Sequence, residues 1–468
     1  MPLLAILIAA ECVLLTGLVV LREPKFLILA VIVGLPIEVV QTQALPTLGQ
    51  SGVAGAIRAL MNPGKAAMLA TIGMAMWQAR WDPRKLIPDS AVLLPITALL
   101  GVVLLGVVWS DSLTPTNAVL IMPLYVAFVF AAPSLIEDKR DLERILGAFL
   151  IVAAGLSLLA IAQRLTGIFQ WRSILIQSDD YSYRSNSTFA DPNHLARYLA
   201  LTMSLAVGLI LSTGPRRLTL YLAIPSLIIS AGGIVMTASR SGWLILLFCT
   251  FLVVVLAPIR RYTRVKLVGL SFAGLVAGVS LLLVQGGTDA ERVKTLASGA
   301  EVLGQREFLI RAGWQMFREN MFIGVGSGNY QHALLVTYRY LIPDWATTTL
   351  SHTSIITILS EMGIVGLLAV LFVSFRVGIA VRIAYRLRQT VTARLVAVWL
   401  AAGMLGILLH SQSEGRLLDD PYLWLLLAIL VAIETRAATA DEASAEPAPV
   451  PARPLSPSLA AGALSATE

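Results

Sequence analysis

The chain has 468 residues, of which 57% are hydrophobic and only 13% are charged. An average soluble domain has about 25% charged residues, so this composition excludes an ordinary soluble protein and indicates a surface that faces lipid. The net charge of +7 comes mainly from short arginine-rich loops, and it is therefore interpreted as an orientation signal rather than a nucleic-acid-binding surface.

Apolar stretches follow one another along most of the chain, and about 20 such residues cross a bilayer as a helix. We predict spans near 2–21, 26–42, 66–79, 91–109, 118–135, 145–163, 194–212, 218–236, 242–258, 265–284, 353–381, 395–410 and 421–435. The third, twelfth and last are short, so twelve spans fit the sequence as well as thirteen. The predicted fold class is an all-α polytopic membrane protein with about 12–13 transmembrane helices.

Alternate loops between these spans differ in basic residues. One set is short and basic, and contains Arg22/Lys25, Arg80/Arg84/Lys85, Lys139/Arg140/Arg144, Arg216/Arg217, Arg260/Arg261/Arg264/Lys266 and Arg382/Arg386/Arg388/Arg394. The other set includes the long segments 164–193 and 285–350 and is sparser in charge. The positive-inside rule assigns the first set to the cytoplasm, so the long loop 285–350 is predicted to be extracytoplasmic.

This pattern predicts four regions in the chain. They are transmembrane helices 1–10 at 1–284, an extracytoplasmic loop region with an amphipathic helix at 285–350, C-terminal transmembrane helices at 351–436, and a disordered cytoplasmic tail at 437–468. Residues 1–21 lack the basic start of a cleavable signal peptide. Cys12 and Cys249 lie in apolar runs without a CxxC motif, so neither a structural disulfide nor a metal site is predicted.

The long loop contains a stretch with helical periodicity, Arg306–Asn320. Its apolar residues Phe308, Leu309, Ala312, Met316 and Phe317 share one face, and Glu307, Arg311 and Arg318 lie on the opposite one. The simpler interpretation is a solvated amphipathic helix on the roof of the membrane domain. The functional interpretation is that its arginines face a water-filled substrate space.

Glycines follow this predicted helix in the segment Phe322-Ile-Gly-Val-Gly-Ser-Gly-Asn329. A nucleotide-binding interpretation is rejected because the motif has no preceding strand and following helix. The glycines instead predict a tight backbone path at the membrane surface.

The chain has four histidines, His194, His332, His352 and His410, all at predicted extracytoplasmic helix ends or in the long loop. A lone histidine is usually a satisfied polar group at a helix end. His352 differs because it opens a predicted span directly after the long loop, and imidazole suits proton abstraction from a hydroxyl. Glu361 lies nine residues further on, roughly 13 Å along a helix, where a charge is costly and usually functional or paired.

Arg240 lies in the minimal loop Thr237-Ala-Ser-Arg-Ser-Gly-Trp243, at the outer boundary between two apolar spans. One interpretation is an interfacial arginine whose charge reaches water beside an interfacial tryptophan. The other is a fixed cation for a lipid-linked phosphate, because guanidinium binds phosphate oxygens bidentately.

Taken in order, these motifs resemble the O-antigen ligase and O-antigen polymerase family of membrane glycosyltransferases. The matching pieces are Ser239-Arg240-Ser241-Gly242, Arg311-x-x-Trp314 with Phe322-Ile-Gly-Val-Gly326-x-Gly328, His352, and Glu361-x-Gly363-x-x-Gly366. Segment Asn186–Asn193 looks like the family's element before a helix. The likeness covers roughly residues 180–370.

The resemblance implies that His352 is the catalytic base, and that Arg240 and Arg311 hold the donor diphosphate, with Arg306 competing for the role of Arg311. It places Glu361 in the same site, where an orienting or pairing role is favoured. It implies an undecaprenyl-diphosphate-linked glycan as donor, a glycan, lipid or lipid-linked acceptor, and neither metal nor other cofactor. Thr353 stands where the family commonly has Asn or Ser, which puts the local hydrogen bonding of His352 in question.

The predicted function is therefore an O-antigen ligase-like glycosyltransferase of the bacterial inner membrane, with its active site facing the periplasm. A repeat-unit polymerase and a protein O-oligosaccharyltransferase share the same donor chemistry. A transporter or lipid flippase is the hypothesis from a different class, and a non-catalytic scaffold is a third. The sparse charge in the central spans argues against the flippase, and no sequence repeat supports an inverted-repeat transporter.

Overall fold

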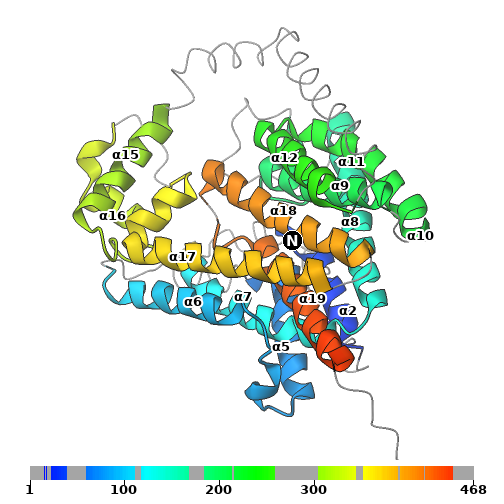
Figure 1. The fold of residues 1–468 in the computed structure, drawn as a ribbon. Coiled ribbons are helices and arrows are strands. Elements are labelled where there is room, and N and C mark those ends of the chain that lie inside the picture. The colour runs from blue at the N-terminus through cyan, green and yellow to red at the C-terminus, as the bar shows by residue number, and fades with distance from the viewer. Residues whose placement is uncertain are drawn as a thin grey trace, which may run out of the picture.

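The computed structural model describes residues 23–39, 60–110, 117–167, 184–212, 216–258, 304–343, 351–387, 391–415 and 417–445. These residues form helices and connecting turns, with no strand among them, which confirms the all-α prediction (Figure 1). Predicted spans 2–21, almost entirely, and 265–284 lie outside the described residues, as does 446–468, most of the predicted tail.

Helices occupy every predicted span in the described part of the chain. They are α2 (Lys25–Gly34), α5 (Pro63–Gln78), α6 (Leu93–Val108), α7 (Asn117–Ala131), α8 (Lys139–Thr166), α9 (Pro192–Leu211), α11 (Ile224–Thr237), α12 (Arg240–Leu256), α17 (Ser354–Leu387), α18 (Val391–Glu414) and α19 (Pro421–Ala445). The short α10 (Arg216–Leu218) precedes α11, and α15 (Gly304–Glu319) and α16 (Tyr330–Val336) lie in the predicted long loop. α19 continues past the predicted tail boundary at residue 437, because the Ala/Glu-rich sequence there favours helix.

Five stretches among the described residues are long and apolar enough to cross a membrane. They are Lys139–Thr166, Pro192–Leu211, Thr219–Thr237, Ser354–Arg386 and Val391–Glu414. Shorter apolar helices, such as α6 and α12, accompany them. The protein is therefore an integral membrane protein of several spans.

The helix α9 is the centre of the bundle, and α17 lies at its edge. Of the apolar 18-residue stretch of α9, 83% is buried, against 11% of the corresponding stretch of α17. A helix this deeply buried is enclosed by others, and α9 contacts α8, α11, α12 and α18. The exposed Leu368, Leu371 and Phe375 of α17 provide a surface for lipid.

The two sets of loops separate to opposite ends of the bundle. At one end, the C-terminal Gln163 of α8 donates to the Ser187 carbonyl at 2.9 Å, so the loop before α9 lies beside the end of α8. The basic residues Lys139 and Arg140 begin α8, and Arg216 and Arg217 follow the far end of α9. These two basic loops, within the described part of the chain, therefore share the end remote from His352.

The helix α17 is broken at Gly363, whose φ of 61° and ψ of −155° leave the helical region. In an intact helix, the amides of Ile364 and Val365 would donate to residues 360 and 361. Here they donate to the Met321 and Phe322 carbonyls at 2.8 and 3.2 Å. The carbonyls of Ser360 and Glu361 in turn accept from Val325 and Gly326 at 2.8 and 3.0 Å. The glycine-containing segment thus inserts into the broken turn of α17.

This break changes the expected depth of Glu361. Of the 34 residues of α17, ten lie up to and including Gly363, which leaves 24 after it. At 1.5 Å per residue these extend about 36 Å, enough to cross the hydrocarbon without help from the first part. The depth of roughly 13 Å expected for Glu361 assumed that one continuous span begins near His352. Because the helix after Gly363 is long enough to cross by itself, Glu361 need not lie at that depth.

The predicted amphipathic helix is confirmed as α15, from Gly304 to Glu319 rather than from 306 to 320. Leu309, Ala312 and Met316 are buried, and the side chain of Arg311 is 67% exposed. The apolar face packs on α16 and α17, and both α15 and α16 lie beside the start of α17, away from α8 and α11 (Figure 1).

Gly363→Ala should destabilise the protein by about 1–3 kcal/mol, because a side chain there is strained at positive φ and would overlap the Phe322 backbone. Gly378 lies in the same helix with open space around it, so Gly378→Ala should be neutral or stabilising by up to about 1 kcal/mol. Thermal unfolding in detergent compares the two variants. Equal effects on Tm would contradict the required break.

Candidate functional site

Arg240 is the first residue of α12 and is held by a tight turn after α11. Ala238 ends α11 in the left-handed conformation, with φ 48°, and Ser239 then caps α12 by accepting from the Gly242 amide at 3.2 Å. This change of direction fixes the backbone of Arg240 and leaves its side chain exposed. The guanidinium is therefore available at the mouth of the bundle.

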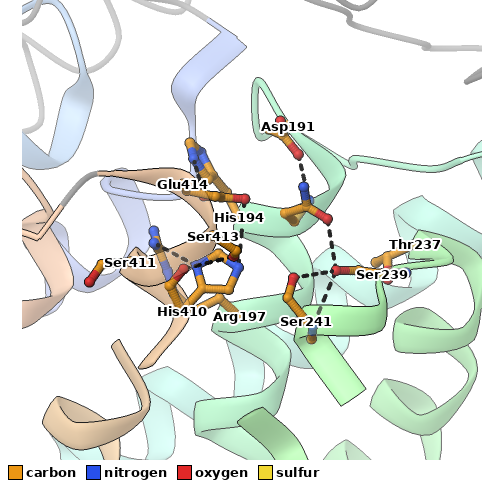
Figure 2. Close-up of polar contacts among 12 residues, drawn as sticks. Asp191, His194, Arg197, Thr237, Ser239, Ser241, His410, Ser411, Ser413 and Glu414 are labelled. Atoms are coloured by element: carbon orange, nitrogen blue, oxygen red, sulfur yellow. Dashed lines mark hydrogen bonds and ion pairs between the residues drawn. The ribbon is translucent and has the colours of Figure 1, made fainter. Parts of the chain in front are cut away.

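The segment before α9 is tied to the Arg240 turn. The Asn193 side-chain oxygen accepts from the Ser239 hydroxyl at 2.8 Å and from the Arg184 guanidinium at 2.6 Å (Figure 2 shows the first contact). Arg184 also donates to the Thr237 carbonyl at 2.9 Å. The element at residues 186–193 and the Arg240 turn, which the sequence identified separately, are therefore one hydrogen-bonded unit.

A set of buried charged residues lies at the same end of α9. We call it the buried ionic cluster, and it consists of Glu38, His194, Arg197, His410, Glu414 and Asp420. His194 Nδ1 lies 3.1 Å from a Glu38 oxygen, and its Nε2 lies 3.3 Å from a Glu414 oxygen. A neutral imidazole donates from only one nitrogen, so the imidazolium form is the one that satisfies both carboxylates.

Arg197 forms the other half of this cluster. Its guanidinium lies 2.7 Å from an Asp420 oxygen, and both side chains are almost completely buried. Its Nη1 also lies 3.3 Å from His410 Nδ1, while His410 Nε2 is 3.6 Å from Glu414 (Figure 2). The cluster thereby joins the first turns of α9 to the end of α18 and to the loop before α19.

The segment carrying His352 docks on this same end of α18. The Ser354 hydroxyl donates to the Ser411 carbonyl at 3.1 Å, and the Ile355 amide donates to the Gln412 side chain at 3.3 Å. Gly415, with φ 71°, has its Cα against the Ser351 carbonyl, and a side chain there would come within 3.3 Å of the His352 Cα. His352 itself is partly buried and lies just before α17.

Glu361 holds the glycine-containing segment in place. Its two carboxylate oxygens accept from the Gly328 and Tyr330 amides at 2.9 and 3.1 Å. Burial and the nearby Glu361 carboxylate raise the pKa of Tyr330, whose hydroxyl donates to the Leu309 carbonyl of α15 at 2.6 Å. Glu361 therefore links α17 to α15 through α16.

Arg306 and Arg311 both lie on the exposed side of α15. Arg311 is ion-paired with Glu307 one turn earlier. Gly313 on the other side of α15 lies against Ile356, where a side chain would overlap, so α15 approaches the first turns of α17 closely. Arg311 therefore lies on the side of α15 that faces away from this contact with α17.

The structure thus brings the predicted residues into two connected groups. Arg240 and His352 are joined through α9 and α18, and Glu361 and Arg311 are joined through α16 and α17. The substrate or catalytic roles of His352, Arg240, Arg311, Arg306 and Glu361 remain predictions. Within the residues described, no group of three or more His, Cys, Asp or Glu side chains is arranged to hold a metal ion.

The sequence reasoning missed the buried ionic cluster. His194 and His410 stood out only as histidines at helix ends, and Glu38, Arg197, Glu414 and Asp420 were not singled out. The available signal was that Glu38 and Arg197 fall inside predicted spans, where a charge needs a partner. Which charges pair could not be found, because the partners are up to several hundred residues apart.

Comparison with known proteins supports the resemblance found in the sequence. Residues 225–371 match the family model described as O-Antigen ligase. The matched segment contains Arg240, Arg306, Arg311, His352 and Glu361. No curated protein matches the chain.

Arg197→Met should destabilise the protein by about 3–5 kcal/mol, because it leaves Asp420 charged, buried and unpaired. The double variant Arg197→Met/Asp420→Asn should recover most of this loss, since it removes the unpaired charge and keeps an oxygen for the Tyr422 amide. Lys139→Met is the control, because its exposed pair with Glu143 contributes about 0–1 kcal/mol. Thermal unfolding would contradict the pairing if the single and double variants were equally unstable.

Proposed function

We propose, from the O-antigen ligase domain at residues 225–371, that this protein is a membrane glycosyltransferase. It transfers an undecaprenyl-diphosphate-linked oligosaccharide or polysaccharide to an acceptor hydroxyl at the outer face of the bacterial inner membrane. The observation that carries the proposal is that one family match spans Arg240, Arg311 and His352.

In the proposed reaction, the acceptor hydroxyl oxygen forms a bond to the anomeric carbon of the donor glycan. The bond between that carbon and the diphosphate oxygen breaks, and undecaprenyl diphosphate leaves. His352 takes the proton of the hydroxyl as general base. Arg240 and Arg311 stabilise the negative charge that develops on the leaving diphosphate, with Arg306 as the other candidate on α15.

The fixed backbone positions of Arg240 and His352 support the proposal. Arg240 begins a helix whose first turn is capped by Ser239, and His352 lies in a segment fixed by two hydrogen bonds to α18. A backbone fixed before substrate binds limits how much freedom these residues lose in the reaction, which is how an active site lowers a barrier by positioning. The exposed arginines stay accessible to an anionic substrate.

The position of the buried charges supports an enzyme over a lipid flippase. In the described part of the chain, the buried ionic cluster lies at the ends of α9 and α18, next to the segments of Arg240 and His352. Charges that line a translocation route would be distributed along the helices. Ligase and polymerase share this donor chemistry, and the product distinguishes them: a new conjugate for a ligase, a longer lipid-linked glycan for a polymerase.

His352→Ala should lower glycan transfer from an undecaprenyl-diphosphate-linked donor by about 10²–10⁴-fold, because the acceptor hydroxyl loses its base. The measurement is product formation by purified protein in detergent, with Tm as the check on folding. His332 on α16 is exposed, so His332→Ala is the matched control and should keep full activity. A folded His352→Ala protein with normal turnover would refute the assignment.

Arg240→Ala should raise the KM for the donor about tenfold or more, because a charge-assisted contact to the diphosphate is lost. Arg240→Lys should recover only part of this, since lysine cannot bind two oxygens in parallel. Arg217→Ala removes an exposed arginine at the other end of the bundle and serves as control. Unchanged donor KM and kcat in Arg240→Ala would exclude the phosphate role.

A further inference from the structure

A recess lies next to the His352 segment, between the first turns of α17 and the loop that joins α18 to α19. Helices α6 and α7 contribute one residue each, Val103 and Met122, to its wall. The space inside it that admits a water-sized sphere is about 80 Å³. At roughly 10–15 Å³ for each water, this is room for about six waters, which is comparable to one sugar ring.

The recess begins where His352 is anchored. Gly415 lines it and also lies against the backbone of Ser351 and His352. Ser354, two residues after His352, lines it from the other side. A molecule in the recess therefore lies within about one helical turn of the histidine backbone.

The polar part of the wall offers oxygen acceptors. Glu361 and Asp419 both line the recess. Each Glu361 oxygen accepts one backbone amide, so each retains capacity for another donor. Ser327 also lines the recess, is 1% exposed, and its hydroxyl has no hydrogen-bond partner among the residues described. Oxygen acceptors of this kind suit neutral groups with several hydroxyl donors.

The rest of the wall is apolar. Ile358, Met362 and Leu418 face the recess together with the residues from α6 and α7. A hydrated cation gains nothing from aliphatic walls, because it prefers oxygen ligands and water on all sides. A sugar ring has hydroxyls at its edge and C–H groups on its faces, so it fits both kinds of wall.

We infer that this recess is the subsite for one sugar ring of the acceptor, with Asp419 and Glu361 accepting hydrogen bonds from the ring hydroxyls. The inference rests on the proposed glycosyl transfer and assigns it a specificity site. The donor diphosphate, which offers hydrogen-bond acceptors rather than donors, is left to the arginines. The acceptor hydroxyl next to the bound ring is then directed towards His352.

The test is sugar binding to the full-length protein in detergent, measured by saturation-transfer NMR without any turnover. The probes are methyl pyranosides of hexoses, 6-deoxyhexoses, N-acetylhexosamines and heptoses. At least one should bind saturably, and Asp419→Asn should weaken its binding about tenfold. Ser327→Ala should weaken it less, and Glu143→Gln, a carboxylate at the far end of α8, should leave it unchanged.

His352→Ala separates the two proposals, because it should abolish transfer and keep sugar binding. Loss of transfer in His352→Ala with unchanged binding in Asp419→Asn would overturn the subsite and leave the proposed function intact. Absence of saturable binding by every probe would also overturn the subsite. So would a rise in wild-type Tm with calcium chloride that Asp419→Asn removes, because the recess would then be a cation site.

Discussion

Buried backbone amides and carbonyls must find partners within the protein, because an unpaired buried group costs free energy. The break in α17 meets this constraint in an unusual way. Gly363 frees two amides and two carbonyls, and the segment from Met321 to Gly326 binds all four. Gly324 permits the approach, because a side chain there would overlap the Glu361 backbone. The position of α15, α16 and the Glu361 carboxylate follows from this exchange of hydrogen bonds.

The first turns of α9 have a comparable role for the rest of the candidate site. Asn193 holds the Arg240 turn, His194 binds Glu414, and Arg197 binds Asp420. The end of α18 then carries the His352 segment. Buried ion pairs contribute little net stability because desolvation offsets their attraction, but they strongly disfavour alternative packings. In this protein the ion pairs lie at the first turns of α9, where segments far apart in sequence meet.

Much of the fold follows from the sequence, because hydrophobic length and basic loops are local signals. The spans, the amphipathic α15 and the grouping of loops by charge were predictable for that reason. The break at Gly363 was not, although the glycines at 324 and 363 were visible. Their positive φ angles are explained by the close approach of the two segments. That contact joins residues far apart in the chain, so the sequence alone does not indicate it.

The candidate site divides in the same way. Arg240, Arg311 and His352 could be proposed from motif order and resemblance, because each lies in a short segment with its own signature. Asp419 and Ser327 could not. Asp419 has no local motif, Ser327 is only the variable position of the glycine-containing segment, and the recess exists only where α17, the α18–α19 loop and α6 meet. The partners of Glu38 and Arg197 could not be identified for the same reason. Ion pairs between segments far apart in the chain produce no regular residue spacing in the sequence.

The shared hydrogen bonds at Gly363 also limit how α15 and α16 can move. A loop that only rested on the bundle could swing away as a lid. Here, withdrawing the segment at Met321–Gly326 would strand four backbone groups of α17, so the two parts belong to one cooperative unit. Two of these groups precede Gly363 and two follow it, so the segment also fixes the two parts of α17 to each other. A separate swing of α15 and α16 would therefore break all four hydrogen bonds at once.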